Sequence, residues 1–162
     1  MGDVAWLSAD ELVIWKNYVA SSMILNESLE RQLQRDSGMP FTYYMIMVML
    51  SEASDRTQSM SVLARLNQSS PSRVSHAVAR MEERGWVTRQ RDHDNARIVR
   101  ATLTDEGWRA LDKAAAGHVR QVRAALFDRL TPDQIEQLGQ IAKAIRGDVD
   151  LEVPADDDLS EC

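Results

Sequence analysis

Apolar residues recur along this chain mostly at the spacing of helices, and in one short region at the spacing of strands. Ser8 and Glu11 have the spacing of a capping box, which predicts that a long helix begins near residue 9. Apolar residues in the first half of this helix occupy more than one side, which indicates that a partner subunit covers them. Gly38 and Pro40 then end the helix and start another.

The next segment, 41–53, reads FTYYMIMVMLSEA. The alternation of Met45, Met47 and Met49 fits a buried strand, whereas the length and the helix propensity of the segment favour a helix. We expect a helix here, with a strand as the alternative.

Two capped helices follow in close succession. The pattern predicts a short helix over 59–67 and, after a turn of a few residues, a second helix over 71–84. Ser70 can cap the second helix, Pro71 suits its first turn, and Gly85 can end it in the left-handed conformation. A helix-turn-helix is therefore expected, with a second helix roughly 21 Å long.

Two strand-like runs, WVTRQR and RIVRATL, come next and are joined by the polar turn DHDNA, which predicts a β-hairpin. Thr104 can cap the helix that follows, and Thr131 with Pro132 starts one more. Along the first of these helices, apolar residues recur at steps of three and four, as in a coiled coil: Trp108, Leu111, Ala115, Val119, Val122 and Leu126.

The predicted fold is mainly α with a small β-hairpin wing. We expect a winged helix-turn-helix lobe over 41–103 and dimerisation helices over 8–36 and 104–146. Residues 148–162 hold seven acidic residues and no basic one. So much charge with so little apolar surface predicts a disordered acidic tail.

Composition narrows the class of protein. Apolar residues make up 44% of the chain and charged residues 27%, as in a soluble globular protein. The longest apolar run, 45–50, is far shorter than the roughly 20 residues that cross a bilayer. The acidic N-terminus differs from a secretory signal, so we expect a cytoplasmic protein. A single cysteine, Cys162, excludes an intrachain disulfide and a cysteine-rich zinc site.

Charge is distributed unevenly along the chain. The net charge is −6, but residues 56–100 hold nine arginines, no lysine and four acidic residues. Local charge decides which surface meets an anion, because salt screens exposed charges beyond roughly 8 Å. On the helix over 71–84, an apolar stripe lies beside a polar one with three arginines and a histidine.

A helix of this length fits the major groove of B-DNA, where an arginine can donate two hydrogen bonds to guanine. The alternative is a solvated helix face, which is usual for an arginine-rich helix in isolation, but the helix-turn-helix and hairpin around it favour DNA binding. We predict that this region contacts DNA through Ser70, Ser72, Arg73, Ser75, His76 and Arg80.

Three stretches carry a resemblance to the MarR (multiple antibiotic resistance regulator) family of winged-helix transcription factors: SVLARL, SSPSRVSHAVARMEERGWVTR and DHDNARIVRATLTDEG. The last is similar to the family's Asp-Pro-x-Asp-x-Arg turn followed by Leu-Thr-x-x-Gly. With the flanking helices the resemblance covers about residues 8–146. It implies a homodimer whose N- and C-terminal helices form the interface and whose two lobes read a palindromic operator, and we expect a repressor.

The resemblance also implies that Arg97, at the tip of the wing, enters the minor groove of DNA. Asn95 stands where the family usually has Asp, so the task of orienting Arg97 falls to Asp92 or Asp94. We expect Asp92, Asp94 and Asn95 to support the wing. The alternative is that Arg97 is a solvated turn residue.

The family implies, further, a small and often aromatic effector bound between the dimer helices and the DNA-binding lobe. Trp15, Tyr18, Tyr44 and Met47 are our candidates for lining such a pocket, although residues of this kind at helical spacing are more often core. His118 is a ligand contact, a pH-sensitive interface residue or a structural histidine.

Other function classes find little support in the sequence. We find no glycine-rich phosphate loop, nucleophile elbow or metal-ligand spacing, so neither an enzyme nor a cofactor is expected. The Asp-His-Asp run at 92–94 is a weak metal candidate. A winged-helix module that binds proteins and responds to no ligand is the alternative, and it predicts DNA binding with little dependence on salt.

Overall fold

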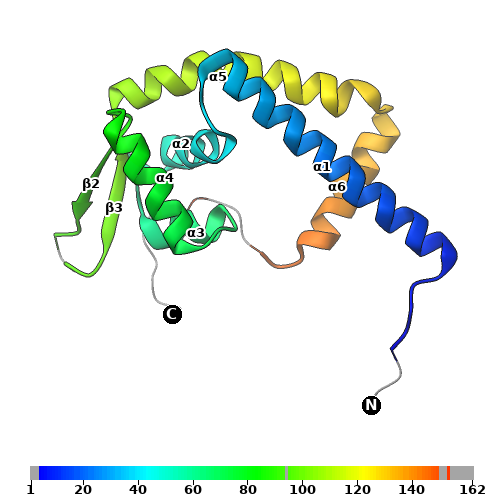
Figure 1. Ribbon diagram of the computed structural model, residues 1–162. Coiled ribbons are helices and arrows are strands. Elements are labelled where there is room, and N and C mark those ends of the chain that lie inside the picture. The colour runs from blue at the N-terminus through cyan, green and yellow to red at the C-terminus, as the bar shows by residue number, and fades with distance from the viewer. Residues whose placement is uncertain (1–3, 94, 150–152, 154–162) are drawn as a thin grey trace.

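The computed structural model describes residues 4–93, 95–149 and 153 of the chain. In that part the fold is mainly helical with one small sheet, as predicted (Figure 1). The helices are α1 (Ala9–Ser37), α2 (Phe41–Glu52), α3 (Met60–Leu66), α4 (Pro71–Glu83), α5 (Asp105–Ala125) and α6 (Pro132–Arg146), and the strands are β1 (Thr57–Ser59), β2 (Val87–Arg91) and β3 (Val99–Leu103). Most of the predicted acidic tail, 148–162, lies outside the described residues, so its disorder stays a prediction.

The helix boundaries follow the local signals in the sequence. The Ser8 hydroxyl accepts from the Glu11 N–H at 3.2 Å, and the Glu11 carboxylate accepts from the Ser8 N–H at 2.7 Å, which completes the capping box of α1. Gly38 ends α1 with a φ of +63°, a conformation that costs glycine little. Ser70 caps α4 by accepting from the Arg73 N–H at 3.4 Å.

Segment 41–53 forms the helix α2, so the alternative of a strand is wrong. Residues Tyr44, Ile46, Met47, Met49 and Leu50 are buried, and they occupy several sides of the helix. α1, α4, α5 and β3 all contact α2, which lies beneath α5 in Figure 1. A helix enclosed in this way loses the one-sided apolar pattern, and this explains the ambiguous alternation of methionines.

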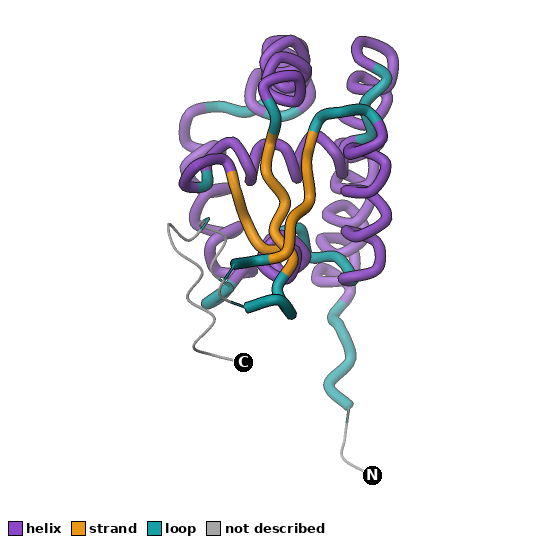
Figure 2. Tube along the Cα trace, turned by 90° about the vertical axis from the view of Figure 1, so that its left-hand side faces the viewer, coloured by secondary structure: helices purple, strands orange, loops and turns teal. Residues whose placement is uncertain are grey.

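The sheet has three antiparallel strands in the order β1-β3-β2 (Figure 2). β2 and β3 are the predicted wing, with Val87 opposite Leu103 and Arg91 opposite Val99. β1 was not predicted, because three residues are too few to show an alternating pattern. It pairs with β3, and the hydroxyls of Thr57 and Thr102 lie 2.8 Å apart across the pair.

One apolar core joins α2, α3, α4 and the sheet, which we call the winged lobe, to the end of α1 and the start of α5. Helix α1 contributes Leu33 to this core, and α5 contributes Leu111 and Ala114. The core thereby fixes the orientation of α4 relative to the two long helices.

The α5 stripe that faces the core differs from the predicted seam. Gly107, Leu111, Ala114 and His118 are buried, whereas Trp108 is 40% exposed and Val119 55% exposed. A Cβ on Gly107 would collide with the carbonyl oxygen of Trp86, so the helix can approach β2 only with glycine at this position. The apolar pattern did not predict this stripe, because two of its four buried residues, Gly107 and His118, are not counted as apolar side chains.

The first two thirds of α1, residues 9–28, and the whole of α6 extend away from the winged lobe on the side opposite the wing (Figure 1). We call these two segments the arm. α6 contains no buried residue, although its spacing is amphipathic. Large exposed apolar side chains of the arm are Val13, Ile14, Trp15, Met23, Ile24, Ile141 and Ile145. No helix in the described part of the chain is long and apolar enough to cross a membrane.

Candidate nucleic-acid interface

Helix α4 presents one apolar and one polar face. Val74, Ala77, Val78 and Met81 are buried in the core, as the stripe in the sequence predicted. Residues of the predicted DNA contact set lie on the other side and are exposed: Ser70, Ser72, Arg73, Ser75, His76 and Arg80. The structure therefore places all six on the surface of one helix and its cap.

The arginines near this face differ in what they contact. Arg73 has no hydrogen bond or ion pair through its side chain among the described residues, and neither does His76. Arg80 forms an ion pair with Glu83 at 2.9 Å, with side chains 69% and 62% exposed. Exposed pairs of this kind contribute about 0–1 kcal/mol, so Arg80 can exchange its carboxylate for a phosphate at little cost.

Arg84, which the helical pattern placed on the same stripe, points elsewhere. Its Nη1 donates to the carbonyl oxygen of Gly38 at 3.3 Å. Its guanidinium carbon lies 4.8 Å from the ring centre of Trp86 and 5.7 Å from that of Tyr43. Arg84 thus joins the end of α4 to the corner between α1 and α2 and does not belong to the exposed basic face.

The wing is tied to α4 by a second arginine. Arg89 donates to one carboxylate, that of Glu82, from Nη2 at 2.6 Å, from Nε at 2.8 Å and from its backbone N–H at 3.1 Å. These hydrogen bonds lower the pKa of Glu82, so that the carboxylate stays ionised at neutral pH. The wing and the helix are consequently held in a fixed relation.

The turn of the wing is organised by Asp92 and Asn95. Asp92 accepts from the Asn95 N–H at 2.9 Å and from the guanidinium of Arg100. Asn95 accepts from the Arg97 N–H at 3.1 Å through its side chain and from the Ile98 N–H at 2.8 Å through its carbonyl. A neutral amide is enough for this, because the donor is a backbone N–H. The predicted supporting residue Asp94 lies outside the described residues.

This geometry differs from the expected orienting pair. Asp92 pairs with Arg100 rather than with Arg97. Arg97 is exposed at the tip of the wing, and its side chain makes no hydrogen bond or ion pair within the described part of the chain. Its guanidinium is therefore available to an external anion.

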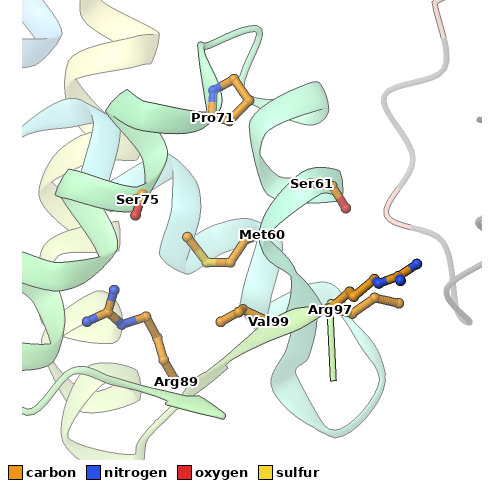
Figure 3. A pocket seen from close by; sticks show the side chains of 8 residues that line it. Met60, Ser61, Pro71, Ser75, Arg89, Arg97 and Val99 are labelled. Carbon is orange, nitrogen blue, oxygen red and sulfur yellow. The ribbon is translucent and has the colours of Figure 1, made fainter. Parts of the chain in front are cut away.

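A hollow of about 420 Å³ lies between the start of α3, the start of α4 and the wing (Figure 3). Met60 and Val99 lie between its two ends, with Arg89 at one end and Arg97 at the other (Figure 3). Ser61, Pro71, Ser75 and Ile98 complete the lining. The basic helix face and the wing tip thus border one concave surface with apolar side chains at its bottom.

The four residues predicted to line a ligand pocket lie in two places. Trp15 and Tyr18 are exposed on the arm, where their ring centres are 6.3 Å apart. Tyr44 and Met47 are buried in the core beside Leu33, which lies about 27 Å along α1 from Trp15 at the rise of an α-helix. A single chain therefore does not bring the four side chains to one pocket.

A buried polar cluster lies where α1, α2 and α5 meet. The ring of His118 lies 4.3 Å from that of Tyr44 and 5.9 Å from that of Phe41, centre to centre. Among the described residues, Nδ1 of His118 and Oε1 of Gln32 are buried without a hydrogen-bond partner. Burial lowers the pKa of His118 and raises that of Tyr44, so both side chains are neutral at pH 7. His118 was singled out in the sequence, but its position beside Tyr44 and Phe41 was not predicted.

The described residues contain no group of three or more histidine, cysteine or acidic side chains that could hold a metal ion. His93 and Asp92 belong to the weak candidate site in the wing, and Asp92 is bonded to Arg100 and to the Asn95 N–H. The third member, Asp94, lies outside the described residues.

Comparison with known proteins gives consistent results. Residues 37–98 match the sequence model of the MarR family. YkoM of Bacillus subtilis (strain 168), an uncharacterized HTH-type transcriptional regulator, is 35% identical over 65 residues, which are 40% of this chain and 42% of YkoM. The match thus spans less than half of that relative. The transcriptional repressor MprA of Escherichia coli (strain K12) is 23% identical over 132 residues, 70% of this chain and 74% of MprA.

Solved structures match over most of the chain. Sco3205, a MarR family transcriptional regulator from Streptomyces coelicolor whose structure was determined in complex with DNA, is 45% identical, with 88% of this chain and 89% of Sco3205 covered and a TM-score of 0.85. AbsC, a MarR family transcriptional regulator from the same organism, is 33% identical, with 88% and 95% covered and a TM-score of 0.82.

Proposed function

The chain belongs to the MarR family and is a DNA-binding transcriptional regulator, and from this premise we propose that it is a repressor that binds a palindromic operator as a homodimer. The observation that carries the proposal is a pair of exposed guanidinium groups, those of Arg73 on α4 and Arg97 on the wing tip, which have no hydrogen-bond or ion-pair partner among the described residues. The structure of Sco3205, which is 45% identical, was determined in complex with DNA, and this supports DNA binding by the present chain.

Each predicted contact residue receives a role in this proposal. Arg73 lies in the first turn of α4, the part of a recognition helix that reaches base edges, and is assigned to a guanine. His76 and Arg80 follow on the same face and contact bases or phosphates. Ser70, Ser72 and Ser75, together with the N–H groups at the start of α4, hold phosphate oxygens. Arg97 enters the minor groove.

The homodimer is supported by the uncovered apolar surface of the arm. Ile14 is 67% exposed, Trp15 54% and Ile145 62% in the single chain. Large apolar side chains exposed together on two helices are typical of a protein–protein contact, and a second arm is the complementary occupant. We therefore assign Trp15 and Tyr18 to the subunit contact. Sedimentation should give twice the 18.3 kDa of the chain, and Ile14→Glu should give the monomer.

Release by a small aromatic or phenolic ligand is the remaining part of the proposal. Its support is the buried cluster of His118, Tyr44 and Gln32, which offers aromatic faces and two unpartnered polar atoms. A phenol can stack on the rings and donate to Gln32 Oε1. A panel of phenols and benzoates should contain compounds that raise the melting temperature and weaken DNA binding, and a panel with neither effect contradicts ligand release.

Titration against DNA from upstream of the protein's own gene, at several salt concentrations, tests the central claim. The logarithm of the binding constant should fall steeply with the logarithm of the salt concentration, because bound arginines release counterions from the duplex. Binding with little salt dependence would instead support a protein-interaction module. Repression is proposed because MprA, which aligns with 70% of this chain, is a repressor. The proposed site of action is the cytoplasm, because the proposed partner is DNA.

A further inference from the structure

The hollow between α3, α4 and the wing combines two kinds of chemistry. Arg97 supplies an exposed cation at one end, Arg89 is paired with Glu82 at the other, and Met60, Ile98 and Val99 supply apolar atoms between them (Figure 3). Phosphate groups are recognised by cations and hydrogen-bond donors, so a DNA backbone matches the ends of the hollow better than its apolar bottom. An occupant with both acidic and apolar side chains would match the whole surface.

The chain itself contains such a segment. Residues 148–162 read DVDLEVPADDDLSEC, in which seven acidic residues alternate with Leu151, Val153 and Leu159. No lysine or arginine neutralises the segment. Its charge is opposite to that of residues 56–100, where nine arginines face four acidic residues.

We propose that the acidic segment 148–162 docks in this hollow and competes there with DNA. The inference rests on the proposed DNA-binding function, because it concerns the same surface. The docked segment places a carboxylate at Arg97 and an apolar side chain against Met60 and Val99. DNA and the segment then exclude each other. The apparent affinity for DNA is therefore set by the fraction of protein molecules in which the segment is not docked.

One described residue of the segment supports this return of the chain. Val153 is partly buried and packs against the apolar core that joins the winged lobe to α1 and α5. Residue 153, seven positions after the end of α6, therefore lies at this core. Nine residues follow Val153, and an extended chain of that length spans about 30 Å, which is enough to follow the whole hollow.

The expected strength follows from the tether. Exposed ion pairs are individually weak, but a short tether holds the segment at an effective concentration on the order of millimolar. If the dissociation constant of the docked segment is about three to ten times smaller than this effective concentration, docking weakens DNA binding roughly three- to tenfold. The effect should disappear at about 1 M salt, where charges are screened beyond about 3 Å.

The first experiment measures DNA affinity by fluorescence anisotropy for the full chain and for a chain that ends at Gly147. The shortened chain should bind roughly three to ten times more tightly at low salt and equally at high salt. A full-length control, in which every aspartate and glutamate of 148–162 is changed to its amide, should behave like the shortened chain. Equal affinities of all three proteins at every salt concentration would overturn the inference and leave the DNA-binding function intact.

The opposite failure is distinguishable. If the shortened chain and the amide control bind DNA no better than an unrelated protein does, the proposed function fails and not only the docking. A synthetic peptide of sequence 148–162 adds an independent measurement, because it should displace DNA from the shortened chain, whereas its amide counterpart should not. Displacement by both peptides, or by neither, contradicts recognition of the acidic groups in the hollow.

The second experiment locates the segment directly. Cys162 is the single cysteine of the chain, so a nitroxide spin label can be attached there without any substitution. At low salt the label should broaden the amide NMR signals of Ser61, Ser75 and Val99, and added duplex DNA should restore them. Broadening confined to the arm, or unchanged by DNA, would overturn the proposal. The labelled amide control should show no broadening at these residues.

Discussion

The guanidinium of Arg84 lies 4.8 Å above the ring of Trp86 while its Nη1 donates to the carbonyl oxygen of Gly38. Helix α4 is thereby attached at its C-terminal end to the residue that terminates α1. Because α1 also forms much of the arm, this contact joins the proposed subunit interface to the proposed DNA-binding surface.

Replacing Arg84 by lysine should therefore destabilise the fold and weaken DNA binding without changing the number of phosphate contacts. Lysine keeps the charge but loses the planar contact with the Trp86 and Tyr43 rings, a change of about 0.5–1 kcal/mol in the free energy of unfolding for an exposed cation–π pair. Urea denaturation measures this loss. The slope of DNA affinity against salt should stay that of the original protein, and a smaller slope would mean that Arg84 touches phosphates after all.

Arg73→Ala should lower affinity for the cognate operator by about 1–3 kcal/mol and relax its sequence preference, because a base-specific pair is lost. Binding to the operator and to random DNA, measured side by side, gives the result. Arg97→Ala is the comparison: it should weaken binding to both duplexes more evenly and reduce the salt slope by about 1. A uniform loss for Arg73→Ala would assign that residue to the phosphates.

Gly107→Ala should destabilise the protein by more than 1 kcal/mol, because the added methyl group would collide with the Trp86 carbonyl oxygen and press on Leu103. Thermal unfolding is the measurement. Gly139→Ala is a matched control, since a Cβ at that position of α6 meets no atom of its own chain within 4 Å and alanine favours a helix. Similar losses in both variants would show that the contact with Trp86 is not the cause.

Stability should depend on pH through His118. Burial lowers the pKa of His118 from its ordinary 6.5, so the folded chain binds fewer protons than the unfolded chain in the window between the two pKa values. The free energy of unfolding should therefore fall as the pH drops below about 6.5, by up to about 1.4 kcal/mol for each unit of pKa difference. His118→Gln should remove this slope.

Asp36 affects the free energy of unfolding in a different, lower range of pH. Its hydrogen bond with Gln32 lowers the pKa of this carboxyl, so its contribution is present above its unfolded pKa, near 3.8, and is lost only as the pH falls further. A slope between about pH 5 and 6.5 that persists in the His118→Gln variant would contradict the assignment to His118.

Local signals in the sequence predicted most of the fold. Ser8, Ser70 and Gly85 mark helix ends through contacts within a few residues, so a reader of the sequence can find them. Strand β1 was not predicted, because three residues are too few to show an alternating pattern and because Thr57 pairs with Thr102, 45 residues away. Long-range pairing of this kind leaves no local trace.

The candidate site was predicted less completely. A helical pattern groups Arg84 with Arg73, His76 and Arg80, but it cannot show that the last turn of α4 meets Gly38 from another helix. The four candidate pocket residues lie in two places within the single chain, because the pattern gives no information on where along α1 the core ends. Which cations already have partners is a property of tertiary packing.

The three hydrogen bonds from Arg89 to Glu82 have a mechanical consequence for release from DNA. Helix and hairpin form one block, so neither can move alone. In the proposed homodimer, a change in the distance between the two DNA-binding surfaces must therefore arise in the long helices of the arm, and a tilt of a few degrees there displaces both elements of a subunit together.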